Sequence, residues 1–212
     1  MKKICIIYTH SKVGDLIWQL PYIESISTHH NTKINLITRM ETQAKDILRD
    51  LNYIKNVEYN AFRKGFYYWV DVLKLLKFFF KHKFSHVYIL DKVNKPAIAA
   101  KISGIKNIIG PGIGKQKYWL TISKFLSESD KNLNYSEQSQ KILKLNNIPI
   151  KNIYPILDIS LSSPDINLNI KQLKGKIISF GIDSGENFKM WYEEYFIELA
   201  EKLYKEKIFD YV

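Results

Sequence analysis

The chain has 212 residues, 46% of them hydrophobic, and its 32 Lys and Arg outnumber its 21 Asp and Glu, which gives a net charge of +11. This length allows one large domain, or one domain and part of another, and the positive charge favours anionic partners such as phosphates or an acidic membrane surface. The single cysteine, Cys5, excludes an intrachain disulfide and a cysteine-clustered zinc site. We expect a cytoplasmic protein, because the apolar run at the N-terminus is too short for a signal peptide and no stretch approaches the roughly 20 apolar residues of a membrane span.

The opening stretch predicts the centre of a sheet. Residues 4–8 are apolar and β-branched, as in a parallel strand buried on both faces. A glycine-bearing turn follows, and a helix is predicted to begin near Asp15, which together make the opening unit of a Rossmann-like sheet. Ligands of such sheets lie beyond the carboxyl ends of the strands, so Asp15 would lie at the edge of a cleft, where a carboxylate can act as general base. The simpler interpretation is that Asp15 only caps the helix.

The rest of the first half alternates between strand and helix patterns. Strands are predicted over residues 33–38, 56–59, 86–91 and 106–110, and helices over residues 40–51, 67–81, 96–102 and 134–145. This alternation predicts an α/β fold with a parallel sheet. The glycine cluster at residues 110–115 lacks the spacing of a phosphate-binding loop and predicts a mobile loop, and the proline-containing residues 146–172 predict a linker.

The helix predicted over residues 67–81 combines aromatic residues with Lys74, Lys77 and Lys81. It is too short and too charged to cross a bilayer. A basic amphipathic helix of this kind can lie on an anionic membrane surface. The simpler interpretation is an ordinary helix that packs against the sheet with its lysines in solvent.

A second unit is predicted to begin near residue 174. A buried strand over residues 175–181, a loop and a helix over residues 191–204 are followed by the start of another strand at residue 207. Because the sequence stops within that strand pattern, we expect two domains, the second one truncated. They are residues 1–165, which include the linker, and residues 172–212.

Two segments resemble glycosyltransferase family 9, the ADP-heptose:lipopolysaccharide heptosyltransferases. The first is the opening strand with Ser11, Gly14 and Asp15, and the second is Lys189-Met190-Trp191 with residues 193–200. The resemblance implies a GT-B fold of two Rossmann-like domains, an acceptor domain followed by a donor domain. It also implies a nucleotide-sugar donor such as ADP-heptose as substrate, and no metal or other cofactor.

The resemblance also implies roles for individual residues. Asp15 would deprotonate the acceptor hydroxyl, and Lys189 would neutralise the leaving diphosphate, with Ser184 and Gly185 contacting the phosphates. For Lys189, a solvated surface lysine is the simpler interpretation. The remaining candidates would contact the acceptor: Ser11, Gly14, Arg63, Lys64, Asn94 and Lys95.

The sequence therefore predicts an inverting glycosyltransferase that moves a heptose or similar sugar to a lipopolysaccharide-core acceptor, in peripheral contact with the anionic inner membrane. Departures from the family pattern are Met190 in place of a basic residue, Tyr192 in place of a proline, and the lack of the Asp-[Ser/Thr]-Gly-x-x-His donor motif. The chain alone is accordingly expected to be inactive. One alternative is a non-catalytic domain that binds anionic glycolipids or phosphosugars. Another is a nucleic-acid-binding module, which only charge and aromatic content support, and no nucleic-acid partner is expected.

Overall fold

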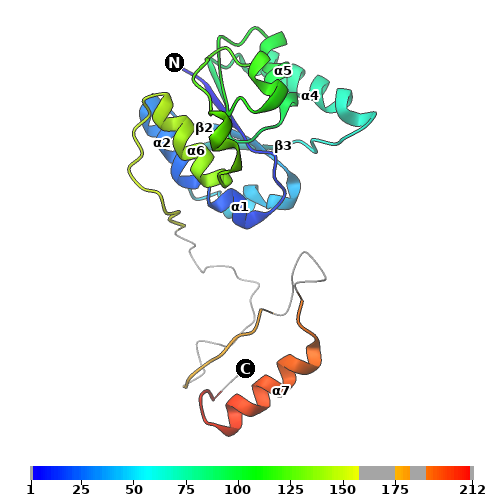
Figure 1. The fold of residues 1–212 in the computed structure, drawn as a ribbon, viewed down its shortest axis with the longest axis vertical. Coiled ribbons are helices and arrows are strands. Elements are labelled where there is room, and N and C mark those ends of the chain that lie inside the picture. The colour runs from blue at the N-terminus through cyan, green and yellow to red at the C-terminus, as the bar shows by residue number, and fades with distance from the viewer. Residues whose placement is uncertain (1, 158–174, 182–189, 211–212) are drawn as a thin grey trace. The chain divides into compact units, whose positions relative to one another are not determined.

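The computed structural model describes residues 2–157, 175–181 and 190–210, and the chain divides into two compact units, residues 1–159 and 160–212. The first unit is built on a five-stranded parallel sheet with the strand order β3-β2-β1-β4-β5 (Figure 1). The strands are β1 (Ile4–Ile7), β2 (Ile34–Thr38), β3 (Ile54–Tyr59), β4 (His86–Ile89) and β5 (Asn107–Ile109). The α/β fold class predicted from the alternating pattern is confirmed.

The central strand β1 is buried on both sides, as its apolar sequence predicts. Ile4 lies opposite Ile34 of β2 and His86 of β4, so β1 is paired along both edges. Because successive side chains of a strand point to opposite faces, Ile4 and Ile6 contribute to one hydrophobic cluster while Cys5 and Ile7 contribute to the other.

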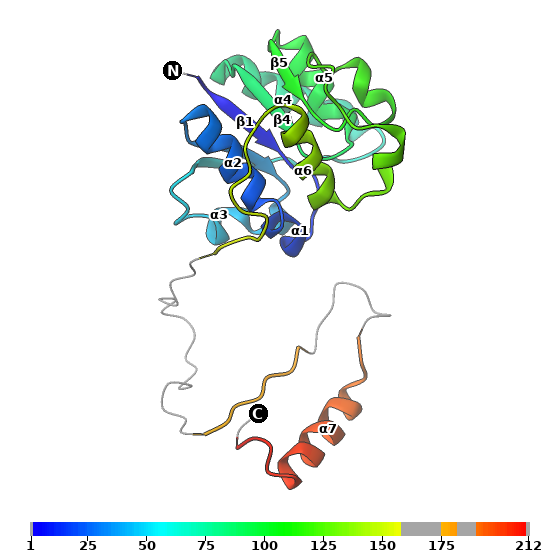
Figure 2. The ribbon, with the colours of Figure 1, turned by 60° about the vertical axis from the view of Figure 1, so that its left-hand side comes forward.

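Helices cover both faces of the sheet. One face is covered by α1 (Val13–Ile17), α2 (Leu20–His30), α3 (Ala44–Ile47) and α6 (Tyr135–Leu145), and the other by α4 (Tyr67–His82) and α5 (Asn94–Ile102). Figures 1 and 2 show α2 and α6 side by side, although more than 100 residues separate them in the sequence. The contact between α2 and α6 holds the start of α6 in place, and that end of α6 lines the cavity described below.

Two predicted segments differ from the structure. The helix predicted over residues 40–51 is broken, because Gln43 adopts a left-handed conformation (φ 50°) between a short 3₁₀ turn, η1 (Met40–Thr42), and α3. The loop at residues 110–115 is not irregular throughout. It leads into a second 3₁₀ helix, η2 (Gly114–Tyr118), and the buried side chain of Gln116 accepts a hydrogen bond from the Gly112 N–H at 2.8 Å.

The linker segment has no helix or strand in its described part, residues 146–157. Before it, a third 3₁₀ helix, η3 (Glu128–Asn132), leads into α6. Among the described residues, no helix combines the length and the apolar character that a membrane span requires.

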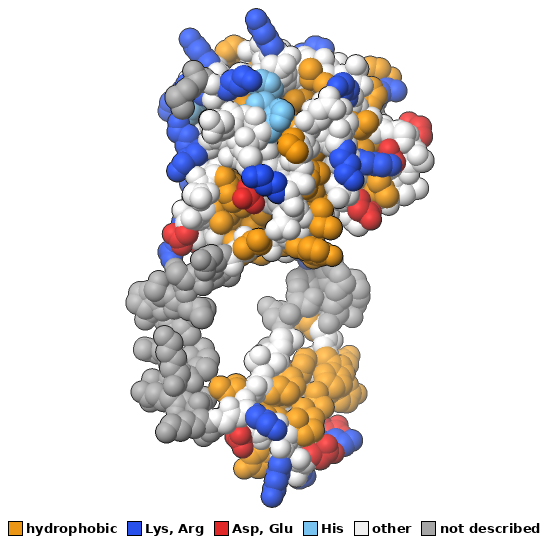
Figure 3. Space-filling model, turned by 90° about the vertical axis from the view of Figure 1, so that its left-hand side faces the viewer, with side chains coloured by type: hydrophobic (Ala, Val, Ile, Leu, Met, Phe, Trp, Pro, Cys, Tyr) orange, Lys and Arg blue, Asp and Glu red, His pale blue; other side chains and the backbone are white. Residues whose placement is uncertain are grey.

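The second unit contains the predicted helix, α7 (Glu193–Lys205). The buried strand predicted over residues 175–181 is wrong, because Ile177 is 45% exposed and makes only an isolated bridge. Residues 207–210 likewise form no strand. The Asp210 carboxylate accepts a hydrogen bond from the Lys176 N–H, and the Asp210 N–H donates one to the Lys176 carbonyl, both at 2.8 Å. Hydrophobic side chains consequently lie on the surface of this unit (Figure 3).

Candidate functional site

The strand order places a crevice between β1 and β4. The chain leaves β1 toward α1 and α2 on one face of the sheet and leaves β4 toward α5 on the other face. In open parallel sheets, ligands bind at such a reversal, outside the carboxyl ends of the strands. The residues that follow β1 and β4 are therefore the first place to look for a site.

Asp91 ties these two strand ends together. Its carboxylate accepts hydrogen bonds from the Thr9 N–H at 2.6 Å and from the Val93 N–H at 3.0 Å, and the Gln116 amide donates to the Asp91 carbonyl at 2.8 Å. Burial raises the pKa of the Asp91 carboxyl, and the two backbone hydrogen bonds oppose that effect. Asp91 thus fixes the start of the turn that leads to Asp15.

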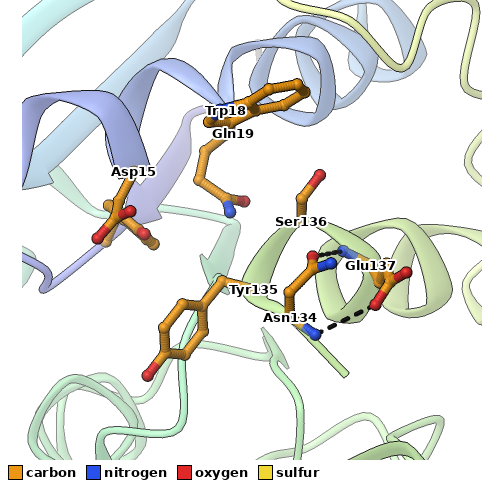
Figure 4. Close-up of a pocket in the computed structure, with 8 residues that line it drawn as sticks. Asp15, Trp18, Gln19, Asn134, Tyr135, Ser136 and Glu137 are labelled. Carbon is orange, nitrogen blue, oxygen red and sulfur yellow. Dashed lines mark hydrogen bonds between the residues drawn. The ribbon is translucent and has the colours of Figure 1, made fainter. Parts of the chain in front are cut away.

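A cavity of about 350 Å³ opens beside this crevice. One side carries Tyr8 from the end of β1 and Asp15, Trp18 and Gln19 from α1 and the residues after it. The other side is the beginning of α6, at residues 134–137. Figure 4 shows the two groups facing each other across the cavity.

Asp15 lies in this cavity and does not cap a helix. It is the third residue of α1, whose N-cap is Lys12 without a side-chain capping bond, so the capping interpretation is wrong. Within the described residues, the Asp15 carboxylate makes no hydrogen bond or ion pair. Burial raises the pKa of the neighbouring Tyr8 phenol, and the charges of Asp15 and Asp91 raise it further. Asp15 is therefore a half-buried carboxylate available to a ligand.

Gln19 reaches the cavity because the helix breaks between α1 and α2. Pro21 stands in the first turn of α2, where its missing N–H costs nothing, and Gln19 becomes the N-cap residue of that helix. The Gln19 side-chain oxygen accepts a hydrogen bond from Ser139 at 2.6 Å, which leaves its NH₂ group buried against the cavity. Within the described residues, neither this nitrogen nor the buried Tyr8 hydroxyl has a hydrogen-bond partner. Because buried polar groups are normally paired, the cavity suits a ligand rich in hydroxyl groups.

The opposite wall is held in place by its own hydrogen bonds. Asn134 and Glu137 form a reciprocal capping box at the start of α6, with N–H to oxygen distances of 2.9 and 3.2 Å (Figure 4). Ser136 hydrogen-bonds the Tyr22 hydroxyl of α2 at 2.8 Å, and the Tyr135 ring lies 4.0 Å from that of His10. These contacts present an aromatic ring opposite Asp15 and Trp18, and aromatic faces are suited to sugar rings.

The predicted acceptor residue Arg63 is held by a buried carboxylate. Its guanidinium lies 2.8 Å from Asp71, and its backbone N–H donates to the same carboxylate at 2.6 Å. Burial acts to raise the pKa of Asp71, but the hydrogen bonds and the charge of Arg63 outweigh it and lower that pKa. Because 40% of the Arg63 side chain remains exposed, the guanidinium keeps a face for an anionic group.

Lys95, another predicted acceptor residue, lies beside Arg63. Its side chain is buried, lies over the Tyr68 ring at 4.7 Å, and donates a hydrogen bond to the Arg63 carbonyl. Burial lowers the pKa of Lys95, and Asp71 opposes that effect. Lys95 therefore supports the Arg63 backbone and is not open to solvent.

Sequence reasoning missed Arg39, which links the two groups of residues. The Arg39 guanidinium donates to the Thr9 carbonyl at 2.6 Å and to the Phe62 carbonyl at 3.1 Å. Its position directly after β2 placed it at the carboxyl edge of the sheet and was the signal that could have identified it. Gln19 carried no such signal, and residues 134–137 were predicted only as the start of a helix.

The other predicted residues are less informative. Ser11, Gly14 and Lys64 are exposed, and Asn94 is the half-buried first residue of α5; none of the four lines the cavity. Ser184, Gly185 and Lys189 lie outside the described residues. Among the residues that are described, no three His, Cys, Asp or Glu side chains are grouped as metal ligands.

The chain is similar to solved structures of glycosyltransferases. Escherichia coli ADP-heptose lipopolysaccharide heptosyltransferase II is 18% identical over 96% of this chain and 62% of its own, with a TM-score of 0.68. A glycosyl transferase of family 9 from Veillonella parvula is 13% identical over 95% and 60% of the two chains, with a TM-score of 0.68. E. coli heptosyltransferase WaaC with ADP-2-deoxy-2-fluoro heptose is 15% identical over 95% and 65%, with a TM-score of 0.67.

These similarities confirm the GT-B type fold that the sequence resemblance implies. No family model and no curated protein matches the sequence. The chain spans about three-fifths of the length of the solved structures that it resembles.

Proposed function

We propose that the chain is the acceptor-side part of an inverting glycosyltransferase that moves a heptose or similar sugar from a nucleotide-sugar donor to a lipopolysaccharide-core acceptor. The observation that carries the proposal is the carboxylate of Asp15, available to a ligand, in a cavity at the carboxyl end of β1. The structural similarity to heptosyltransferases supports it, as do the Gln19 nitrogen and the Tyr8 hydroxyl, for which the described part of the chain supplies no hydrogen-bond partner.

In this mechanism Asp15 takes the proton of an acceptor hydroxyl. The hydroxyl oxygen attacks the anomeric carbon of the donor as the bond from that carbon to the phosphate oxygen breaks, so the configuration inverts and the nucleoside diphosphate leaves. Lys189, with Ser184 and Gly185, would neutralise the leaving group. No metal or cofactor besides the donor is required. Trp18 and Tyr135 would hold the acceptor sugar between them, and Arg63 would attract its anionic groups.

The cellular setting follows from the substrates. Nucleotide sugars are cytoplasmic, and the buried free thiol of Cys5 is compatible with a reducing compartment. We place the reaction at the cytoplasmic side of the membrane that carries the growing glycolipid.

The test measures transfer from ADP-heptose to a core acceptor in extracts of cells that express the gene encoding this chain. Asp15→Asn keeps the side-chain shape but removes the proton acceptor, so transfer should fall by about 10²–10⁴-fold while acceptor affinity changes little. Asp50→Asn, which alters an exposed carboxylate, is the matched control. The anomeric configuration of the product, read by NMR, tests inversion.

Two outcomes would contradict the proposal. Near-normal transfer by Asp15→Asn would remove Asp15 as the base. Acceptor binding without transfer from any nucleotide sugar would instead indicate the non-catalytic glycolipid-binding domain.

A further inference from the structure

The helix α4 has two hydrophobic faces, of which only one is used inside the protein. Val72, Leu75 and Phe79 are 1–2% exposed and pack in the cluster that covers the sheet. Figure 1 shows α4 on the outside of the unit, beside α5. Its remaining hydrophobic residues therefore require another explanation than core packing.

We define the outer α4 face by four residues: Phe66, Trp69, Leu73 and Phe80. Their exposed fractions are 85%, 62%, 62% and 57%. At about 100° per residue, Phe66 at the N-cap and the three helix residues fall within an arc of about 60°, centred about 120° from the buried face. Contiguous exposed apolar patches are rare on soluble proteins and mark interaction surfaces.

A row of lysines borders the outer α4 face. Lys74, Lys77 and Lys81 are exposed and lie next to the apolar arc in the same helical projection. Within the described residues, none of them forms an ion pair, and the helix has one acidic residue, the buried Asp71. The surface is thus apolar along one strip and positive along its border.

This combination fits the interface of a bilayer with anionic headgroups. Tryptophan and phenylalanine favour the headgroup boundary, and each nearby lysine is attracted by the negative surface potential. A protein partner would need its own acidic groove of matching length, whereas an anionic bilayer supplies both the apolar layer and the charge. We propose that the outer α4 face and its lysine row dock this protein on an anionic membrane surface, with α4 lying in the plane of the interface.

The docked helix would bring the candidate acceptor residues close to the lipid. The amino-terminal end of α4 is next to Arg63, whose guanidinium lies 4.6 Å from the centre of the Tyr67 ring. This consequence, the presentation of a membrane-linked acceptor, rests on the proposed function, but the docking itself does not.

The experiment measures sedimentation of the purified 212-residue chain with vesicles. Vesicles of phosphatidylcholine alone are compared with vesicles that contain about a third phosphatidylglycerol, at about 50 and 500 mM salt. We expect binding to the anionic vesicles that weakens at high salt. Lys74→Glu/Lys77→Glu/Lys81→Glu should weaken it at least about tenfold, as should Trp69→Ser/Leu73→Ser.

Matched variants separate docking from general charge and hydrophobicity. Lys115→Glu/Lys144→Glu/Lys151→Glu has the same net charge, and Ile102→Ser/Tyr118→Ser removes the same number of exposed apolar side chains; both should bind as the wild type does. Circular dichroism checks that all variants are folded. Equal sedimentation with neutral and anionic vesicles, or equal loss in the α4 and control variants, would overturn the proposal. Neither result bears on transfer by Asp15, which the extract assay measures separately.

Discussion

Asp91→Ala tests how strongly the ends of β1 and β4 are held together. The substitution removes the acceptor of two backbone N–H groups, the buried one of Thr9 and the half-buried one of Val93. A hydrogen bond to a charged group contributes about 1.5–3 kcal/mol, so the pair contributes about 3–6 kcal/mol. Because removal of the buried carboxylate also relieves its desolvation, we expect a net loss of about 2–4 kcal/mol in the free energy of unfolding.

The loss is measured by thermal and urea unfolding. In a unit of this size it corresponds to a melting temperature lower by about 5–15 °C. Asp91→Asn keeps one acceptor oxygen, so its melting temperature should lie between those of the wild type and Asp91→Ala. Asp50→Ala is the matched control, because that carboxylate is 63% exposed and its pairing with Arg49 is at the surface. If Asp91→Ala has the same melting temperature as Asp50→Ala, the Thr9 and Val93 N–H groups have found other hydrogen-bond partners, and the reasoning fails.

Two further predictions concern other parts of the first unit. Gly112→Ala should lower the free energy of unfolding by about 2 kcal/mol or more, because φ is +69° there and a Cβ would lie 2.5 Å from the Phe125 side chain. Gly114→Ala is the matched control: φ is +62°, but nothing lies within 4 Å of the added Cβ, so the loss should be only about 1 kcal/mol. Urea unfolding measures both losses. Burial, and then the charge of His86, lower the pKa of His30 from 6.5 to about 4. Because the unfolded state therefore binds the proton at a higher pH than the folded state, the free energy of unfolding should fall by about 1–2 kcal/mol as the pH drops from 6.5 to 4. His30→Gln should flatten that part of the pH profile, and an unchanged slope in the variant would exclude His30 as its cause.

The sheet was predictable from the sequence because its signal is local. Strands buried on both faces read as short β-branched runs, and the run at residues 4–8 matches β1 within one residue. The helices α4, α6 and α7 were found for the same reason, through their apolar periodicity. The single helix predicted after β2, over residues 40–51, was wrong. One left-handed residue, Gln43, interrupts an apolar pattern that looks continuous in the sequence.

The site was only half predictable. The turn after β1 identified the position of Asp15, because parallel strands have their ligands at their carboxyl ends. The wall formed by residues 134–137 depends on contacts between α2 and α6 that no local pattern encodes. The strand predicted in the second unit failed for a related reason: an apolar segment is buried only where a partner surface covers it, and Ile177 has none among the described residues.

The division of the cavity between two distant segments has a consequence for how specificity can change. The segment after β1 holds the Asp15 carboxylate, and the start of α6 holds the facing wall, fixed by a capping box of its own. A substitution at Tyr135 would change the wall that faces Asp15 without changing α1, the helix that carries Asp15. In the proposed transferase, selection could therefore exchange one acceptor for another at residues 134–137 while Asp15 stays the same.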